Sequence, residues 1–248
     1  MTYVDEPRHP TGPNEPWGVK RDGAGALTAK FKRTYDAVGL VINYRLYWQG
    51  GPKKNIGPTE FGKIVDGIRL ARSMLDVATS KLSNIDNLDD TTSSILKYHF
   101  NIDTKSNDQS HLKIIQMRFW QISDGLKEQV IICATTKLSK YTRGETTPDK
   151  PIHINKRILK NCSEAIARTI IHEGAHKFSE VKSHYGEIYC DNDHYGKEHH
   201  SNTIDRADSY AWTALSLYSG RPLSHLNFEN DSGIEFEADE HGKYVARV

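Results

Sequence analysis

The chain has 248 residues, of which 37% are hydrophobic, and its mean hydropathy of −0.64 is that of a polar chain that still buries a core. Its 33 basic and 32 acidic residues give a net charge of +1, which excludes a strong field that would attract nucleic acid or a membrane surface. No apolar run is as long as a membrane span, and the first residues lack the apolar segment of a signal peptide. We therefore expect no nucleic-acid and no membrane partner, and a product that stays in the cytoplasm or is exported by a signal-independent secretion route.

The N-terminal half is expected to be mostly helical. Residues 1–26 are rich in Pro and Gly, which indicates an N-terminal arm, and residues 34–51 fit a strand or a short helix before a Gly-Gly-Pro turn. An amphipathic helix, capped by Thr59, is predicted to follow. Apolar residues at steps of three and four predict further helices within 89–100 and 110–126.

In the second half the apolar period changes. The β-branched residues of 129–136 and the alternating residues of 151–155 predict two short strands. A helix is predicted over 163–178, and another from a cap at Thr203 to a stop at Gly220.

These elements indicate one domain over residues 27–222, followed by an irregular segment at 223–248. The fold class that we expect is α+β, mostly helical with a small sheet. The three cysteines are an odd number, so they cannot all be paired in disulfides within the chain, and no two of them have CxxC spacing. We therefore expect them to be structural or incidental. The alternative is one disulfide with a spare thiol. The cysteines are Cys133, Cys162 and Cys190.

The helix predicted over 163–178 carries the sequence HEGAH. Residues four apart lie on one face of a helix, so His172 and His176 can bind a single metal ion. Glu173 is turned by about a hundred degrees from His172 and can act as a general base beside the ion without binding it. This spacing is typical of a zinc hydrolase, in which the base takes a proton from the water that attacks a peptide carbonyl.

The neighbours of the motif favour a buried helix. Ile166, Ile170 and Ile171 are apolar, and Gly174 and Ala175 leave room around the histidines. The alternative is a surface helix with two solvated histidines. We disfavour it, because two His and a Glu within a buried segment would lack partners without an ion.

A catalytic zinc usually has a third protein ligand. Lys182 stands where the metzincin pattern requires His, which excludes that class, and Glu198 is at a thermolysin-like distance but within a charged run. The segments IIHEGAHKF (170–178) and RADSYAWTALSLYSG (206–220) resemble the deuterolysin or aspzincin zinc endopeptidases, and the resemblance covers about residues 129–220.

The resemblance implies an α+β zincin-like domain, one catalytic Zn²⁺ and a protein or peptide substrate. PIHIN (151–155) is similar to the family's edge strand, which borders the active-site cleft and holds extended substrate by backbone pairing. The family's Asp ligand lies in a G-T-x-D-x-x-Y-G loop, which is absent here; YCDNDHYG (189–196) comes nearest. The resemblance thus favours Asp193 as the third ligand, with Glu187 as the alternative, followed by Asp191 and His184.

In the same family a tyrosine after the Asp donates its hydroxyl to the developing oxyanion, and Tyr195 is the candidate here, with Tyr189 behind it. Asp208 falls on the apolar face of its predicted helix, and a buried acid needs a partner. It either holds the ring N–H of a histidine ligand or, as the Lys-specific members imply, forms part of a substrate pocket. The second acid of that pocket is replaced by Ala211, which leaves specificity open, and Tyr210 is expected in the core or the pocket wall.

The residues therefore favour a zinc endopeptidase, with a secreted effector or toxin as its context and an immunity protein or inhibitor as a candidate partner. One alternative is a catalytically impaired zincin-like domain that binds a peptide or partner. Another is a metal-binding module whose His-rich residues, 184–200, bind metal weakly. Glu173 favours the enzyme, because a structural metal site gains nothing from a free base beside the ion.

Overall fold

The computed structural model describes most of the chain between residues 58 and 223 and several strands outside it. The described residues are 58–105, 109–128, 130–135, 138, 143–146, 151–179, 181, 195, 197 and 199–223, together with the strands at 19–21, 27–29, 32–35, 41–49, 236–238 and 244–246.

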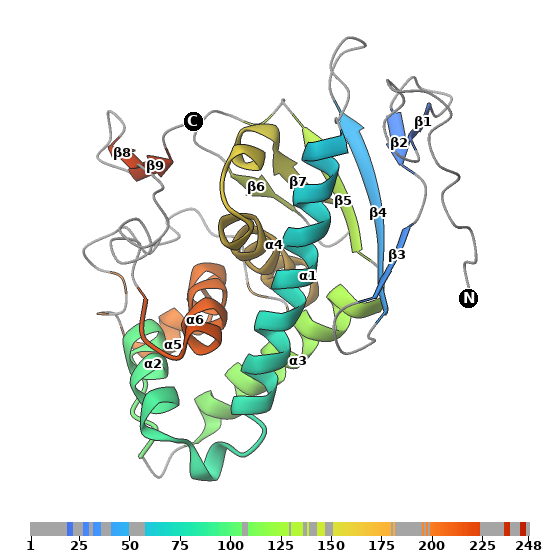
Figure 1. Cartoon of the computed structure of the whole chain (residues 1–248). Coiled ribbons are helices and arrows are strands. Elements are labelled where there is room, and N and C mark those ends of the chain that lie inside the picture. The colour runs from blue at the N-terminus through green and yellow to red at the C-terminus, as the bar shows by residue number, and fades with distance from the viewer. Residues whose placement is uncertain are drawn as a thin grey trace.

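Seven of the described strands form one mixed sheet, in the order β1-β2-β4-β5-β7-β6, with β3 also paired to β4 (Figure 1). Their bounds are β1 Val19–Arg21, β2 Leu27–Ala29, β3 Lys32–Tyr35, β4 Val41–Gln49, β5 Val130–Thr135, β6 Gly144–Glu145 and β7 Ile152–Asn155. The first four strands pair antiparallel, β4, β5 and β7 run parallel, and β6 is antiparallel to β7.

The pairing of β5 with β7 produces an apolar face on the sheet, on which the helices pack. Ile132 pairs with Ile152 and Ala134 with Ile154, and all four side chains are fully buried. Residues two apart point to the same face of a strand, so these side chains form an apolar layer on one face. That face packs on the helices.

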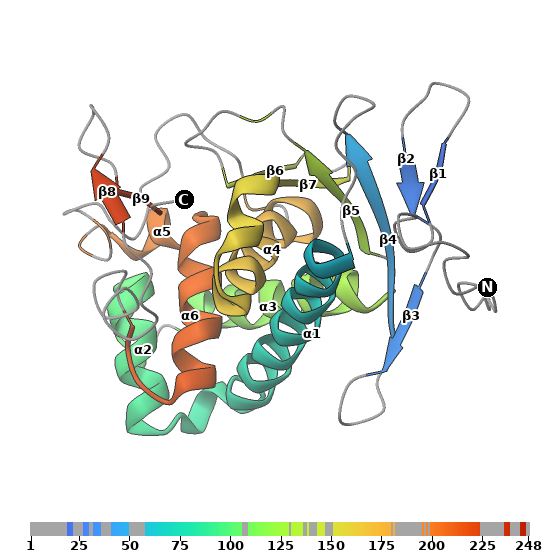
Figure 2. The same cartoon turned by 45° about the horizontal axis from the view of Figure 1, so that its top comes forward.

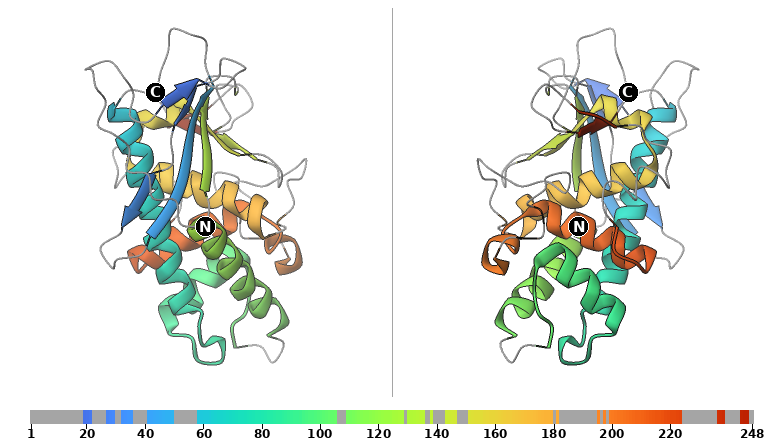
Figure 3. Two further views of the ribbon diagram at one scale, coloured as in Figure 1. Left: turned by 90° about the vertical axis from the view of Figure 1, so that its right-hand side faces the viewer. Right: turned by 90° about the vertical axis from the view of Figure 1, so that its left-hand side faces the viewer.

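The helices gather on one side of the sheet, with α4 between α1 and α6 (Figures 1 and 2). Their bounds are α1 Pro58–Lys81, α2 Asp90–Phe100, α3 Ser110–Glu128, α4 Ser163–Phe178, α5 His200–Thr203 and α6 Ala207–Ser219, with 3₁₀ turns η1 Ile85–Asn87 and η2 Lys156–Lys160. Figure 3 shows the sheet over one end of the molecule and the green helices α2 and α3 at the other. None of the helices in the described part of the chain combines the length and apolarity of a membrane span.

The sequence predicted these helices from their apolar faces. Ile64, Ile68 and Leu75 on α1 are buried as expected, and α2 begins after Asp89, whose side chain accepts a hydrogen bond from the Thr92 N–H. The start of α1 differs from the prediction, because the helix begins at Pro58 and Thr59 lies inside it. Proline is well suited to a first turn, where its missing N–H is not needed.

The α+β class is confirmed, while several elements differ from the sequence analysis. For residues 34–51 the strand alternative is confirmed by β4, whereas residues 19–21 in the predicted arm form β1. Thr203 does not cap α6 but ends the short α5; α6 starts at Ala207 after Arg206. Within the segment expected to be irregular, β8 Phe236–Ala238 pairs antiparallel with β9 Tyr244–Ala246. The domain boundaries at 26 and 222 stay predictions.

The predicted edge strand is not the edge of the sheet. β7, which contains most of PIHIN, has β5 on one side and β6 on the other, with Gly144 opposite Ile154 and Glu145 opposite His153. Among the described strands, β6 is the outermost on this side. The strand β6 has two residues and no alternation of apolar and polar residues, so the sequence could not predict it. It is defined only by its pairing with β7.

Candidate metal centre

Helix α4 brings the HEGAH sequence into the interior of the molecule. Ile166, Ile170 and Ile171 are fully buried, and the helix contacts α1, α3, α6 and β7. Glu173 and His176 are 4% and 8% exposed, so the alternative of a surface helix with solvated histidines is wrong. Cys162, directly before α4, has a free thiol whose pKa is raised by burial.

His172 is held by helix α6. Its Nδ1 lies 3.1 Å from Oδ1 of Asp208, which sits in the first turn of α6 and is 6% exposed. The carboxylate accepts, so the imidazole donates through Nδ1–H, and in its neutral form the ring has its lone pair on Nε2. Histidines that bind zinc commonly have this arrangement, in which a carboxylate fixes the ring and its tautomer.

His176 is held in the same way by the backbone. Its Nδ1 lies 3.0 Å from the carbonyl oxygen of Val181, an atom that can only accept, so Nδ1 carries the proton. The rings of His172 and His176 are 5.0 Å apart between centroids and cross at 81°. In the neutral form of each ring, Nε2 is then the acceptor, which is the atom that a metal ion would bind.

Glu173 lies against the backbone of the edge strand β6. A Cβ atom added at Gly144 would stand 2.7 Å from Oε1 of Glu173 and 3.0 Å from its Cδ. Such distances are below van der Waals contact, so the strand can approach the carboxylate this closely only because residue 144 is a glycine. The candidate base thus lies directly beside the edge strand. No pattern in the sequence pointed to Gly144.

Tyr195 is tied to a histidine that the sequence analysis also missed. Its hydroxyl lies 2.8 Å from Nδ1 of His99 on α2, and Nε2 of His99 lies 2.8 Å from Oγ of Ser216 on α6. His99 is fully buried, and burial lowers its pKa to about 3, so the ring is neutral at neutral pH. Its only signal in the sequence was its place on the apolar face of α2 beside Leu96 and Phe100.

Tyr210 has a structural place in the core. Its hydroxyl donates to the carbonyl oxygen of Ile204 at 2.8 Å, and its ring packs edge-on against Phe100 and Phe119. The residue has no exposed surface, and Arg118 also contacts its hydroxyl. The expectation that Tyr210 lines a substrate pocket is therefore not met, and its core alternative agrees with the structure.

The candidates for the third ligand lie outside the described residues. They are Asp193, Glu187, Asp191 and His184, and Tyr189 lies there too. Over the described residues alone, no three His, Cys, Asp or Glu side chains are grouped so as to hold a metal ion. His172 and His176 are two residues of a suitable kind for a metal site, and both their role as ligands and the choice of the third stay predictions.

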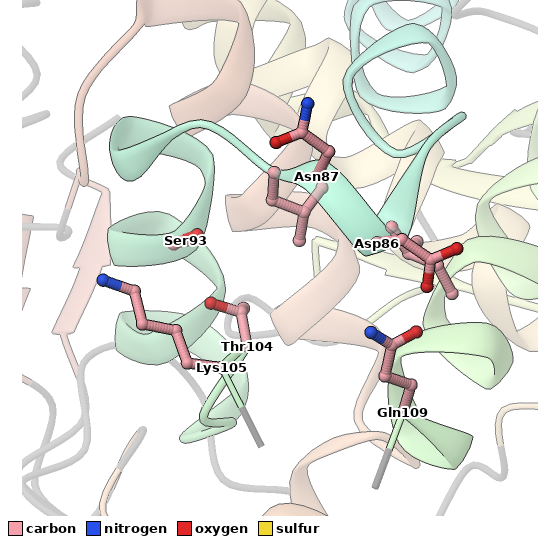
Figure 4. A pocket seen from close by; sticks show the side chains of 8 residues that line it. Asp86, Asn87, Ser93, Thr104, Lys105 and Gln109 are labelled. Atoms are coloured by element: carbon pink, nitrogen blue, oxygen red, sulfur yellow. The ribbon is translucent and has the colours of Figure 1, made fainter. Parts of the chain in front are cut away.

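A pocket of about 340 Å³ lies elsewhere, between η1, the start of α2 and the residues before α3 (Figure 4). Its lining is mostly polar and includes Asp86, Ser93, Lys105 and Gln109. No residue of HEGAH lines it. This pocket is separate from the candidate metal centre.

Comparison with known proteins gives a likeness of fold. No family model matches the chain, and no curated protein matches its sequence. A solved zinc peptidase from Grifola frondosa is similar in structure, with a TM-score of 0.50 and 13% sequence identity, over 62% of this chain and 92% of the peptidase chain. At this identity the likeness shows the fold alone: the chain has a zinc-peptidase-like α+β fold.

Proposed function

We propose that the chain is a zinc-dependent endopeptidase. The observation that carries the proposal is the pair of histidines on α4, each fixed through Nδ1 so that Nε2 is the acceptor, with Glu173 beside them under the edge strand. The likeness to a zinc peptidase supports the same function. A histidine pair that served only packing would not need both rings held in the metal-binding tautomer.

The residues that would hold the zinc are His172, His176 and Asp193, with Glu187 as the alternative third ligand. The donor set fits zinc, which binds neutral imidazole and carboxylate in tetrahedral sites that keep one position open. When bound, the ion supplies Lewis acidity, which makes a water molecule more acidic and polarises the carbonyl of the substrate.

Glu173 is the general base in this proposal. It takes a proton from the attacking water and passes it to the leaving amine. Its position beside β6 supports this role, because an extended peptide that paired with the sheet edge would lie close to it. Tyr195 would donate its hydroxyl to the developing oxyanion, and Asp208 would orient His172.

The substrate class that we propose is a protein or peptide, with its specificity open. Asp208 is engaged with His172 and Ala211 is fully buried, so an acidic pocket for a lysine side chain finds no support at these two positions. A role as a secreted effector or toxin, with an immunity protein or inhibitor as partner, is the biological context that we propose for such a peptidase. The proposed peptidase activity does not depend on this biological context.

The test measures zinc content and casein cleavage by the purified chain and by Glu173→Gln. We expect about one zinc per chain in both proteins, chelator-sensitive cleavage by the first, and a loss of roughly 10²–10⁴-fold in the variant because the general base is gone. Zinc bound in equal amount to the chain without any chelator-sensitive cleavage would exclude the peptidase. That result would favour the alternative of a zincin-like binding module.

A further inference from the structure

The strongest unexplained feature beside the metal centre is the buried histidine His99. It connects two elements that are far apart in sequence, since Tyr195 lies 96 and Ser216 lies 117 residues away. It is fully buried, and both of its ring nitrogens have a partner at 2.8 Å. Helix α2, residue Tyr195 and helix α6 are thus joined through one imidazole.

We assign the direction of each hydrogen bond from the acceptor that the buried Ser216 O–H requires, because its oxygen alone could accept two hydrogen bonds. The backbone N–H of Leu223 donates to Oγ of Ser216 at 3.0 Å. The Ser216 hydroxyl is fully buried, and its acceptor among the described residues is Nε2 of His99. Since Nε2 accepts and a neutral imidazole carries one proton, that proton is on Nδ1. In this assignment His99 donates to the hydroxyl oxygen of Tyr195, so the proton of that hydroxyl is not directed at His99.

The surroundings keep the imidazole neutral. The Tyr98 ring meets His99 edge-on at 4.9 Å, Tyr195 lies at 5.8 Å between centroids, and Ser216 faces it from α6. Burial lowers the pKa of His99, and Asp208, whose charge acts in the opposite direction, does not offset it. Asp208 is also the residue that holds His172. His99 is therefore close enough to the metal centre for the charge of Asp208 to reach it.

We propose that His99 is a positioning residue, which fixes the Tyr195 hydroxyl as a hydrogen-bond donor toward the substrate oxyanion through the chain Leu223–Ser216–His99–Tyr195. The proposal rests on the proposed function. In this arrangement His99 does not touch the substrate. It sets both the place of the Tyr195 hydroxyl and the direction in which its proton points, so that no reorientation is needed when charge develops on the carbonyl oxygen.

The first measurement does not depend on activity. Long-range ¹H–¹⁵N NMR spectra of ¹⁵N-histidine-labelled chain, with His99→Leu to assign the signal, report which ring nitrogen carries the proton. We expect a neutral His99 protonated on Nδ1 at neutral pH. A signal from the Nε2–H form, or from a charged ring, would overturn the proposal whether or not the chain cleaves peptides.

The second measurement is a double-variant cycle on cleavage kinetics. We expect His99→Leu to lower kcat about tenfold, the size of one hydrogen bond, with KM within twofold and zinc content unchanged. His99→Asn, whose amide N–H replaces Nδ1–H, should lose less. In the Tyr195→Phe background the His99→Leu change should cost nothing more, and independent, additive losses would overturn the proposal.

A matched pair on α6 tests the other end of the hydrogen-bond chain and covers the case in which His99→Leu does not fold. Ser216→Ala removes the donor to Nε2, whereas Ser209→Ala makes the same change at a buried hydroxyl that has no partner in the described part of the chain. We expect a fall in kcat for Ser216→Ala only. Equal effects would overturn the proposal. Absence of cleavage by the unaltered chain would refute the proposed function, and the NMR result would then decide the state of His99 alone.

Discussion

At the scale of single residues, the contact between Asp208 and His172 favours one of the two roles that the sequence left open for Asp208. The carboxylate is buried and lies 3.1 Å from Nδ1 of His172. A buried acid in that position stabilises the ring in one tautomer and is not accessible to a substrate side chain. The structure thus favours the role beside the histidine.

Removal of the Asp208 carboxylate should weaken zinc binding. We expect Asp208→Ala to lower the affinity for zinc about 10–100-fold, because His172 loses the acceptor that orients its ring. Competition with a chromophoric chelator measures the affinity. Ser209→Ala, the next residue along α6 and also buried, is the control; an equal affinity in Asp208→Ala would show that the carboxylate does not support the ligand.

The third ligand is tested by a pair of variants. If Asp193 completes the site, Asp193→Ala should lose stoichiometric zinc and Glu187→Ala should retain it, because two imidazoles alone bind zinc weakly. Zinc content after gel filtration is the measurement. Retention of zinc by both variants would leave Asp191 and His184 as the next candidates and would remove both leading assignments.

At the scale of elements, the close packing around α4 explains how the motif is kept in place. A Cβ added at Gly67 on α1 would lie 2.4 Å from Cγ2 of Ile166 on α4. Helices pack this closely only where one of them presents a residue without a side chain. The guanidinium of Arg168, one turn before His172, stacks at 4.0 Å over the ring of Trp212 and joins α4 to α6.

This close approach predicts opposite effects for two glycines of one helix. Gly67→Ala should destabilise the fold by about 1–3 kcal/mol, because the added methyl group overlaps with Ile166. Gly62→Ala, with nothing within 4 Å of the added Cβ, should be neutral or stabilise by up to about 1 kcal/mol through helix propensity. Urea unfolding of both variants gives the two changes, and a stable Gly67→Ala would show that α1 and α4 separate readily.

The sequence predicted the elements with a strong apolar period and missed those that depend on distant partners. The buried faces of α1, α3 and α4 repeat every three or four residues, so their helices were found. The strand β6 has two residues, and its place is set by pairing with β7. No local pattern could show that Gly144, and not PIHIN, occupies the outer side of the sheet.

At the scale of the whole molecule, the candidate site is assembled from segments that a local pattern cannot join. The four-residue spacing of His172 and His176 was visible in the sequence, and so was the apolar setting of Asp208. The contact of His172 with a residue 36 positions away needed the packing of α6 on α4. His99 had no signature that distinguished it, because one histidine on the apolar face of a helix is an ordinary core residue.

The buried His99 also predicts how stability changes with pH. Its pKa is about 3 in the folded chain and 6.5 in the unfolded chain, so below pH 6.5 the unfolded state binds a proton that the folded state does not. This lowers the free energy of unfolding as the pH falls through this window toward 3. Between pH 7 and pH 5 we expect a loss of about 2 kcal/mol from this residue.

Urea unfolding at pH 7 and pH 5 measures this loss, and His99→Leu isolates it from the other titrating groups. The variant should show a smaller decrease in stability over the same interval, since leucine does not bind a proton. Identical pH dependence in the two proteins would mean that His99 is accessible to protons in the folded chain.

The shortness of β6 limits what the sheet edge can recognise. Of the described residues on this side, only Gly144 and Glu145 form the outermost strand, so a neighbouring chain finds few backbone groups with which to pair. An unpaired edge is also the place where sheets of separate molecules join, and a short one reduces that hazard. If the chain binds an extended peptide as we propose, these two residues offer it few backbone partners, and selectivity among peptides would then come from contacts made by their side chains.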